Sequence, residues 1–308
     1  MRQVFFIWAM LITSLHLYAQ DCDIPLRVIV PWQVEELPTA SKAYFVNKLR
    51  QIVVNNGIVG SSECTPFAIT AKFDIIDKHV VPGPPSKIVQ TLSISLFIID
   101  THEEKIFSST SIDVKAVGNN ETKAYMDAIK QISPSNKEVQ GFVQVGKNKM
   151  LDYYDRNFNV IIKKAQTLAS LKKYEEALYH VTSIPECSKG YDVSVKIALS
   201  IFQAYENQLC TENLAKAKMA WVSDQSTAGA NKAGQFLSCI YPDAACYEEA
   251  MQLYKEIKEK IVSDWKFEMK QYSDAVSLES QRISAVKAIG TAYGNGQKPT
   301  TTSLIWMK

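Results

Sequence analysis

The sequence lacks the spaced motifs that identify common enzyme and metal-binding families. Its 308 residues contain no Cys-x-x-Cys pair and no Gly-x-Ser-x-Gly, and no cysteine has a histidine at the spacing of a metal motif. These absences argue against a zinc finger, a thioredoxin-like redox site and an α/β-hydrolase. We therefore predict no catalytic residue, no cofactor-binding residue, no metal ligand and no cofactor.

A large net charge is also missing. The chain has 34 Lys and Arg residues against 32 Asp and Glu residues, for a formal charge of +2 at pH 7. Such a balance creates no broad electrostatic field that would attract nucleic acid or an anionic surface, so we predict no nucleic-acid partner. The hydrophobic content of 46% is typical of a packed soluble protein and not of a disordered one.

No uninterrupted apolar run is long enough to span a bilayer, which takes about 20 residues. The apolar run Val4–Ile12 follows Arg2 and precedes the small residue Ala19, an order typical of a cleavable secretory signal. We predict a signal peptide over residues 1–19 and no transmembrane anchor after cleavage, with an uncleaved anchor as the alternative. An acidic residue precedes Cys22 where lipidation needs a small one, so the mature protein is expected to be unlipidated.

Three histidines follow the signal, namely His79, His102 and His180. If the strands predicted below pair as antiparallel neighbours, His79 and His102 fall near opposite ends of the sheet and do not share a metal. Each histidine is interpreted as a surface or packed residue. Glu103 and Glu104 are predicted to be solvated at a hairpin tip.

One segment matches the spacing of a nucleotide-binding phosphate loop, Gly141–Asn148. That loop needs Ser or Thr after its lysine to hold magnesium, and an open interior for backbone approach to phosphate. Asn148 stands at the first of these positions, and the bulky Phe142 and Val143 lie inside the segment. We interpret the match as chance.

The chain has six cysteines, at Cys22, Cys64, Cys187, Cys210, Cys239 and Cys246. In an oxidising compartment they can pair. Cys22 and Cys64 flank a predicted strand and helix that bring the chain back on itself, and they are the candidate disulfide. Cys187 and Cys210 bracket a helix predicted over residues 191–209, and its length of about 28 Å is too great for them to pair. Cys239 and Cys246 could close a turn, or the four later cysteines could be buried thiols.

The amino-terminal half shows a mixed α/β pattern. Alternating or β-branched runs predict strands, and apolar residues at helical spacing predict helices. The expected strands are residues 26–31, 67–81, 92–98 and 106–114, and the expected helices are residues 40–55 and 122–132. With a short turn at residues 100–105, the predicted sheet is mostly antiparallel.

This half resembles the small α/β domain of periplasmic assembly proteins: the curli-secretion lipoprotein, activators of peptidoglycan synthases and the TolB amino-terminal domain. The resemblance covers about residues 24–150. It rests on a helix that ends in Asn56-Gly57 before a strand, and on Lys115–Gly118 followed by a helix with Ala124 and Ala128. It implies a domain that binds partners or builds assemblies.

The carboxyl-terminal half repeats a helical signature. Tyr174 precedes Ala177 in Tyr-Glu-Glu-Ala, Tyr247 precedes Ala250 in the same motif, and the segment around Ala217 is a weaker copy. The pattern resembles tetratricopeptide (TPR) repeats, in which a small alanine lets two helices approach closely. The alanine separations of 40 and 33 residues depart from the family period of about 34. An irregular helical bundle is the alternative.

These patterns predict an α+β fold, with a small, mostly antiparallel α/β sandwich domain followed by an all-α TPR-like helical-repeat domain. The expected division is a signal peptide over residues 1–19, an α/β domain over 20–150, a TPR-like domain over 151–262, a capping helix over 263–296 and an extended tail over 297–308. Ile305 and Trp306 in the tail could dock onto the chain itself or onto a partner.

The leading functional hypothesis is an exported, non-enzymatic scaffold that binds envelope proteins or peptides, located in the periplasm or associated with the outer membrane through its partners. One alternative is an envelope hydrolase whose site forms only in three dimensions, with a carboxylate pair, or His79 beside an acid, in a deep pocket. Another is a carrier of a small apolar ligand, which needs a closed apolar cavity between the domains.

The signal-peptide interpretation predicts the amino terminus of the mature protein. When the full chain is expressed in a bacterium that has a secretory pathway, we expect cleavage after Ala19 and a mature protein that begins at Gln20. Intact-mass measurement and terminal sequencing of the exported protein check this. Retention of residues 1–19 on the exported protein would contradict it.

Overall fold

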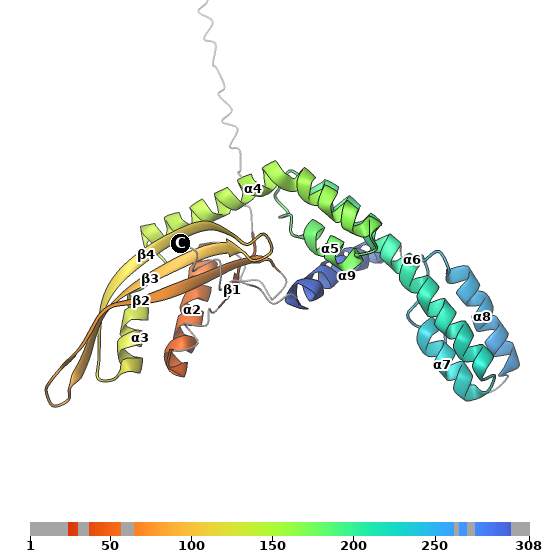
Figure 1. The fold of residues 1–308 in the computed structure, drawn as a ribbon, viewed down its shortest axis with the longest axis horizontal. Coiled ribbons are helices and arrows are strands. Elements are labelled where there is room, and N and C mark those ends of the chain that lie inside the picture. Colours follow the sequence, from red (N-terminus) through yellow and green to blue (C-terminus); the bar gives the residue numbers. More distant parts are fainter. Residues whose placement is uncertain (1–23, 30–36, 57–64, 262–264, 270–274, 297–308) are drawn as a thin grey trace, which may run out of the picture.

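The computed structural model describes residues 24–29, 37–56, 65–261, 265–269 and 275–296. A four-stranded sheet is followed by a series of helices, which confirms the predicted α+β class. Together they form an elongated arch with the sheet at one end (Figure 1). The elements of the sheet half are β1 (Arg27–Val28), α2 (Thr39–Asn55), β2 (Phe67–Val81), β3 (Lys87–Asp100), β4 (Lys105–Gly118) and α3 (Glu121–Gln131).

The strands lie in the order β1-β2-β3-β4. β1 pairs parallel with the start of β2, at Ala68 and Ile69, and the other neighbours are antiparallel. The mostly antiparallel prediction is therefore confirmed. β3 and β4 are longer than their apolar patterns suggested, because the ladder between them continues from Ile88 opposite Gly118 to Asp100 opposite Lys105. Phe67 lies opposite Asp100, so the β3–β4 turn sits beside the start of β2.

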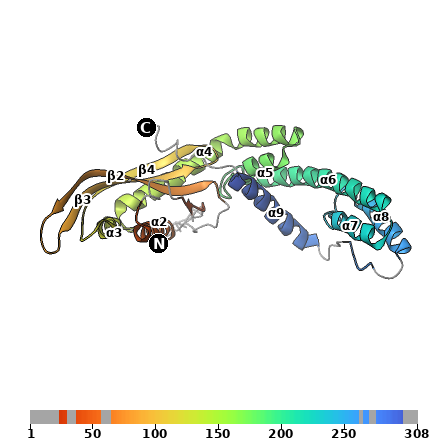
Figure 2. The ribbon, with the colours of Figure 1, turned by 60° about the horizontal axis from the view of Figure 1, so that its bottom comes forward.

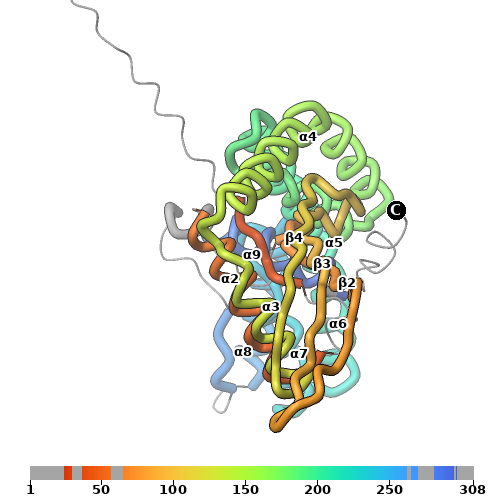
Figure 3. Tube along the Cα trace, turned by 90° about the vertical axis from the view of Figure 1, so that its left-hand side faces the viewer, coloured from red at the N-terminus to blue at the C-terminus, as the bar shows by residue number. Residues whose placement is uncertain are grey.

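The two faces of the sheet differ because side chains alternate along each strand. Leu92, Ile94 and Leu96 of β3 are fully buried. They lie on the face covered by α2, α3 and the first part of the next helix (Figure 3). The intervening residues of β3 are more polar, and Ser95 there lies 2.8 Å from Ser111 of β4, hydroxyl to hydroxyl. The sheet half is thus a two-layer structure with one solvated face.

A single long helix, α4 (Lys137–Ser170), crosses from the sheet into the helical half (Figure 1). Its glycine at Gly146 allows close contact with the sheet, since a Cβ there would lie 2.6 Å from Cδ1 of Ile98. The segment Gly141–Asn148 lies inside this helix and forms no loop. Its interpretation as a chance match to a phosphate loop is confirmed. The predicted domain boundary at residue 150 falls within this helix.

The helical half continues with α5 (Tyr174–Thr182), α6 (Tyr191–Ser223), α7 (Thr227–Leu237), α8 (Tyr247–Lys260) and α9 (Ala275–Gly296). Its apolar side chains divide between two cores. The first core extends from the sheet through α4 and α5 to the first half of α6, including Ile201 and Phe202. The second contains the rest of α6 with α7 and α8, including Leu214 and Trp221. The two cores therefore share α6, which is longer than the helix predicted over 191–209.

Both strong signature motifs begin helices, since α5 starts at Tyr174 and α8 starts at Tyr247. Ala177 and Ala250 are fully buried where these helices pack. Ala217 is buried too, but it lies in the middle of α6, so the weaker copy does not begin a helix.

The last helix differs from the capping helix that was predicted over residues 263–296. Residues 265–269, expected to be helical, are not, and Trp265 and Met269 instead bury their side chains in the second core. α9 then returns to the middle of the molecule and packs on α5 and α6 (Figure 2). An ion pair between Arg282 of α9 and Asp243 holds it beside the segment that precedes α8.

A disulfide joins Cys210 of α6 to Cys246, the residue before α8. Both alternatives for the later cysteines are therefore wrong: Cys239 does not pair with Cys246, and the four cysteines are not buried thiols, since Cys239 is a free, exposed thiol. The prediction that Cys187 and Cys210 do not pair is confirmed, and Cys187 is disulfide-bonded as well. The candidate pair Cys22 and Cys64, the signal peptide and the tail with Ile305 and Trp306 lie outside the described residues.

The Cys210–Cys246 disulfide closes a loop of 36 residues in the unfolded chain. We expect Cys210→Ser combined with Cys246→Ser to lower the free energy of unfolding of the second core by about 3–4 kcal/mol. Urea denaturation followed by tryptophan fluorescence measures this, because Trp221 is buried in that core. The matched control is Cys239→Ser, which removes an exposed free thiol and should leave the transition unchanged. Equal effects of the two changes would contradict the prediction.

Candidate functional site

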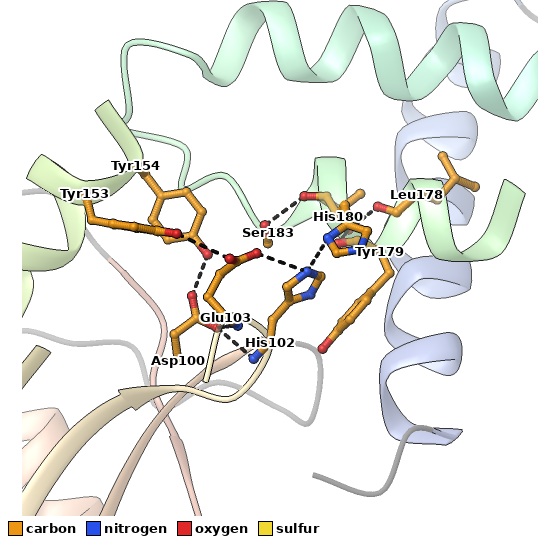
Figure 4. Close-up of polar contacts among 10 residues, drawn as sticks. Asp100, His102, Glu103, Tyr153, Tyr154, Leu178, Tyr179, His180 and Ser183 are labelled. Atoms are coloured by element: carbon orange, nitrogen blue, oxygen red, sulfur yellow. Dashed lines mark hydrogen bonds and ion pairs between the residues drawn. The ribbon is translucent and has the colours of Figure 1, made fainter. Parts of the chain in front are cut away.

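A cluster of polar side chains lies where the sheet meets the helical half (Figure 4). The β3–β4 turn contributes Asp100, His102 and Glu103, and two helices supply the others. α4 places Tyr153 and Tyr154 against the turn. α5 approaches it from the other side with Tyr179 and His180. The cluster therefore joins three elements that are far apart in the sequence.

Asp100 at the end of β3 organises the turn. Its carboxylate is fully buried and accepts a hydrogen bond from the Tyr154 hydroxyl at 2.6 Å. The same carboxylate accepts the backbone N–H groups of His102 at 2.8 Å and Glu103 at 3.1 Å. Burial raises the pKa of Asp100 to about 6, although these hydrogen bonds oppose that shift. Asp100 thus fixes the backbone that presents His102 and Glu103.

His102 and His180 meet ring to ring, through a hydrogen bond between Nε2 of His102 and Nδ1 of His180. Burial lowers the pKa of His102 to about 3, and the charges of His180 and Lys164 contribute. Burial also lowers the pKa of His180 to about 4, again with a contribution from Lys164. Both imidazoles are therefore neutral at physiological pH, and one of the two facing nitrogens carries a proton while the other accepts it.

Glu103 completes the cluster. Its Oε1 lies 3.4 Å from Nε2 of His102, and its Oε2 accepts a hydrogen bond of 3.2 Å from the Tyr153 hydroxyl. The ammonium of Lys105 lies 3.9 Å from the centre of the Tyr153 ring, and the hydroxyl of this tyrosine is the group that binds Glu103. The prediction that Glu103 is simply solvated at a hairpin tip is wrong, because α4 covers it. Glu104 is exposed as expected.

The ligand atoms of His102, Glu103 and His180 lie within 4.8 Å of one another, which makes these three residues a possible metal-binding set. The tyrosines around them are poor proton donors to solvent. Burial raises the pKa of Tyr153 and of Tyr179 to about 12. The His102 ring packs against that of Tyr179, with centroids 3.9 Å apart.

A pocket of about 360 Å³ adjoins the cluster between the start of the sheet, α5 and α9. Thr101, Tyr179 and Ser183 line the side nearest the cluster. Its charged residues are Arg27, Glu186 and Lys287. Lys287 and Glu186 form an ion pair of 2.8 Å, so their charges offset each other.

The third histidine lies elsewhere. His79 pairs with Asp77 at 3.0 Å on the exposed outer half of β2, opposite Val89 in the register. The prediction that His79 and His102 are at opposite ends of the sheet and do not share a metal is confirmed.

The meeting of His102 and His180 was missed from the sequence because 78 residues separate them. One signal was present. His180 follows Ala177 by three residues and precedes Ile184 by four, which places it on the apolar stripe of its predicted helix. A polar residue on such a stripe needs a buried partner. Nothing in the sequence named the β3–β4 turn as the place of that partner.

Comparison with known proteins gives little further information. No protein family matches the chain, and no characterised protein matches it in sequence. A crystal structure of a minor lipoprotein from Acinetobacter baumannii aligns over 41% of this chain and 94% of its own, with 13% identity and a TM-score of 0.25. At that score the similarity supports no conclusion about fold or function. Within the described ranges, no helix is both long and apolar enough to cross a membrane.

The two neighbouring tyrosines of α4 provide a matched test of the turn. We expect Tyr154→Phe to lower the free energy of unfolding by about 1.5–3 kcal/mol at pH 8, because it removes a buried hydrogen bond to the Asp100 carboxylate. Tyr153→Phe is the control. It removes a longer, less buried bond to Glu103 and should cost at most about 1 kcal/mol. Urea denaturation of both variants measures the difference, and a larger loss for Tyr153→Phe would contradict the assigned role of Asp100.

Proposed function

We propose that this protein is an exported, non-enzymatic interaction protein of the bacterial cell envelope. It binds an extended segment of another envelope protein along the outer half of β2. The observation that carries the proposal is the open edge of this strand, which projects with β3 as a hairpin past the covering helices (Figure 1).

In the part of the chain that the structure describes, β1 pairs with β2 only at Ala68 and Ile69, which leaves the rest of this edge open. Beyond Ile69, no described residue pairs with that side of β2, although the strand continues to Val81. An unpaired strand edge offers backbone donors and acceptors to another extended chain. Peptide-binding domains use the same geometry to add a strand from a partner.

Apolar side chains on this half of the strand favour a protein partner. Ile75 and Ile76 are 51% and 59% exposed, and Val80 and Val81 are 62% and 43% exposed. Grouped exposed aliphatic residues of this kind are typical of interaction sites.

The charges on the same segment are largely paired within the chain. Lys72 forms an ion pair with Asp74 at 3.0 Å, and Lys78 reaches Glu121 of α3 at 2.6 Å. A partner therefore meets apolar side chains and a backbone edge, with little net charge to repel it.

A register shift between Ile75 and Asp77 bends the edge and limits regular pairing to short segments.

Two features support export to an envelope. The amino-terminal segment has the order of a secretory signal. The Cys210–Cys246 disulfide suits an oxidising compartment. The helical half, with its two Tyr-Glu-Glu-Ala helices, adds further surface of the TPR-like kind for a second contact.

The enzymatic alternative has weaker support. The side chain of His102 is only 1% exposed, so a substrate cannot reach it as a general base. His79 does stand beside an acid, Asp77, but both are more than half exposed on the hairpin, and neither lines the 360 Å³ pocket. For the carrier alternative, the pocket beside α5 has charged residues in its wall, whereas an apolar ligand favours an apolar cavity.

The proposal predicts position-specific crosslinking. A photo-crosslinking amino acid at Ile76 or Val80 of the full chain, expressed in its native envelope, should yield an adduct with one envelope protein. The same amino acid at Val222, which is 75% exposed on α6, is the control and should not yield that adduct. Mass spectrometry of the crosslinked peptides should locate an extended partner segment.

A second variant tests the strand edge itself. Lysines at edge strands oppose strand addition, so Ile76→Lys combined with Val80→Lys should abolish the adduct formed from Val81. Val222→Lys should leave it intact. Recovery of the monomer alone, or equal crosslinking from Val222, would count against the proposal.

A further inference from the structure

Three metal-ligand side chains converge at the junction of the sheet and the helical half. His102 and Glu103 come from the β3–β4 turn, and His180 comes from α5 (Figure 4). In a tetrahedral zinc site with bonds of about 2.0–2.2 Å, neighbouring ligand atoms lie about 3.3 Å apart. Nε2 of His102 and Oε1 of Glu103 already have such a separation, at 3.4 Å.

The donor atoms are chemically available. Neutral imidazole is the form that binds a metal, and histidine takes this form readily near pH 7. Tyr153 occupies only Oε2 of Glu103, so Oε1 faces the histidines. Nδ1 of His102 is buried without a hydrogen-bond partner, so no acceptor or donor has to be given up when the ring proton moves to Nδ1. Nε2 can thus present a lone pair.

The surroundings hold two of the three ligands in place before any ion binds. Asp100 accepts the backbone N–H groups of His102 and Glu103, and Tyr154 fixes Asp100 in turn. Supporting hydrogen bonds of this kind orient ligands in metal sites. The required movement is small, since the two imidazole rings need only separate enough to admit an ion between their facing nitrogens.

One group opposes a cation here. The charge of Lys164, on α4, acts on both histidines and disfavours a second positive charge near them. Lys164 is exposed, so its long side chain can move into solvent when an ion binds. Glu176 of α5 acts on His180 in the opposite sense and favours positive charge.

We propose that His102, Glu103 and His180 bind one divalent transition-metal ion of the zinc type. Two imidazoles and one carboxylate are a donor set that zinc accepts, with water in the fourth position. Because its ligands come from the turn and from α5, the bound ion fastens the sheet to the helical half. This proposal is independent of partner binding at β2.

The test is a zinc titration of the mature, tag-free protein with its disulfides intact, in a Cys239→Ser background that removes the free thiol. After treatment with a chelator, competition against a chromophoric zinc indicator should show one site per chain. His180→Gln should weaken binding by more than about 100-fold and Glu103→Gln by at least about tenfold. Lys164→Gln should strengthen it.

His79→Gln is the matched control. It removes an exposed histidine that also has a carboxylate neighbour, and it should leave zinc affinity unchanged. Circular dichroism of each variant verifies folding, and the absorption spectrum with Co²⁺ should show nitrogen and oxygen ligation with no thiolate band. Zinc should raise the melting temperature of the parent protein but not that of His180→Gln.

Two results would overturn the proposal. One is zinc affinity in the parent no higher than in folded His180→Gln. The other is stoichiometric binding that persists in both His180→Gln and Glu103→Gln, which would place the ion elsewhere.

Discussion

The buried hydrogen bond between Tyr154 and Asp100 is the contact on which the junction depends. It joins the end of β3 to the middle of α4, in a place where an unpaired carboxylate would be costly. Because the same carboxylate also holds the backbone of the β3–β4 turn, the position of α4 determines where His102 points. α5 packs on α4, so His180 is placed by the same helix. One buried interaction therefore brings two distant histidines together.

Two long helices carry the architecture. α4 contacts the sheet near Gly146 and continues into the helical half, and α6 contributes to both cores. A helix that is packed along its whole length transmits a fixed distance and direction. The arch therefore needs no large interface between its ends, and the outer half of β2 projects free of the rest. The Cys210–Cys246 disulfide secures the far end, where the second core is small.

The sequence predicted local helices and strands better than the contacts between elements that are far apart in the chain. Alternation gave the bounds of β2 correctly, and the Tyr-Glu-Glu-Ala motifs marked the starts of α5 and α8. Periodicity misread residues 265–269 as helix, because tertiary burial of Trp265 and Met269 in the second core decides their conformation. The candidate site could not be predicted, since it depends on a contact across 78 residues and has no characteristic spacing. Only burial of His180 was indicated.

The return of α9 to the first core has a consequence for the order of folding. Val286 of α9 is 3% exposed and belongs to the core that begins in the sheet, whereas α7 and α8 form their own core in between. In chain order, the residues of the second core therefore lie between residues that belong to the first core. During synthesis or export the first core cannot complete its packing around α5 and α6 until nearly the whole chain has emerged. The second core can pack before the chain is complete, because its contacts are local in sequence.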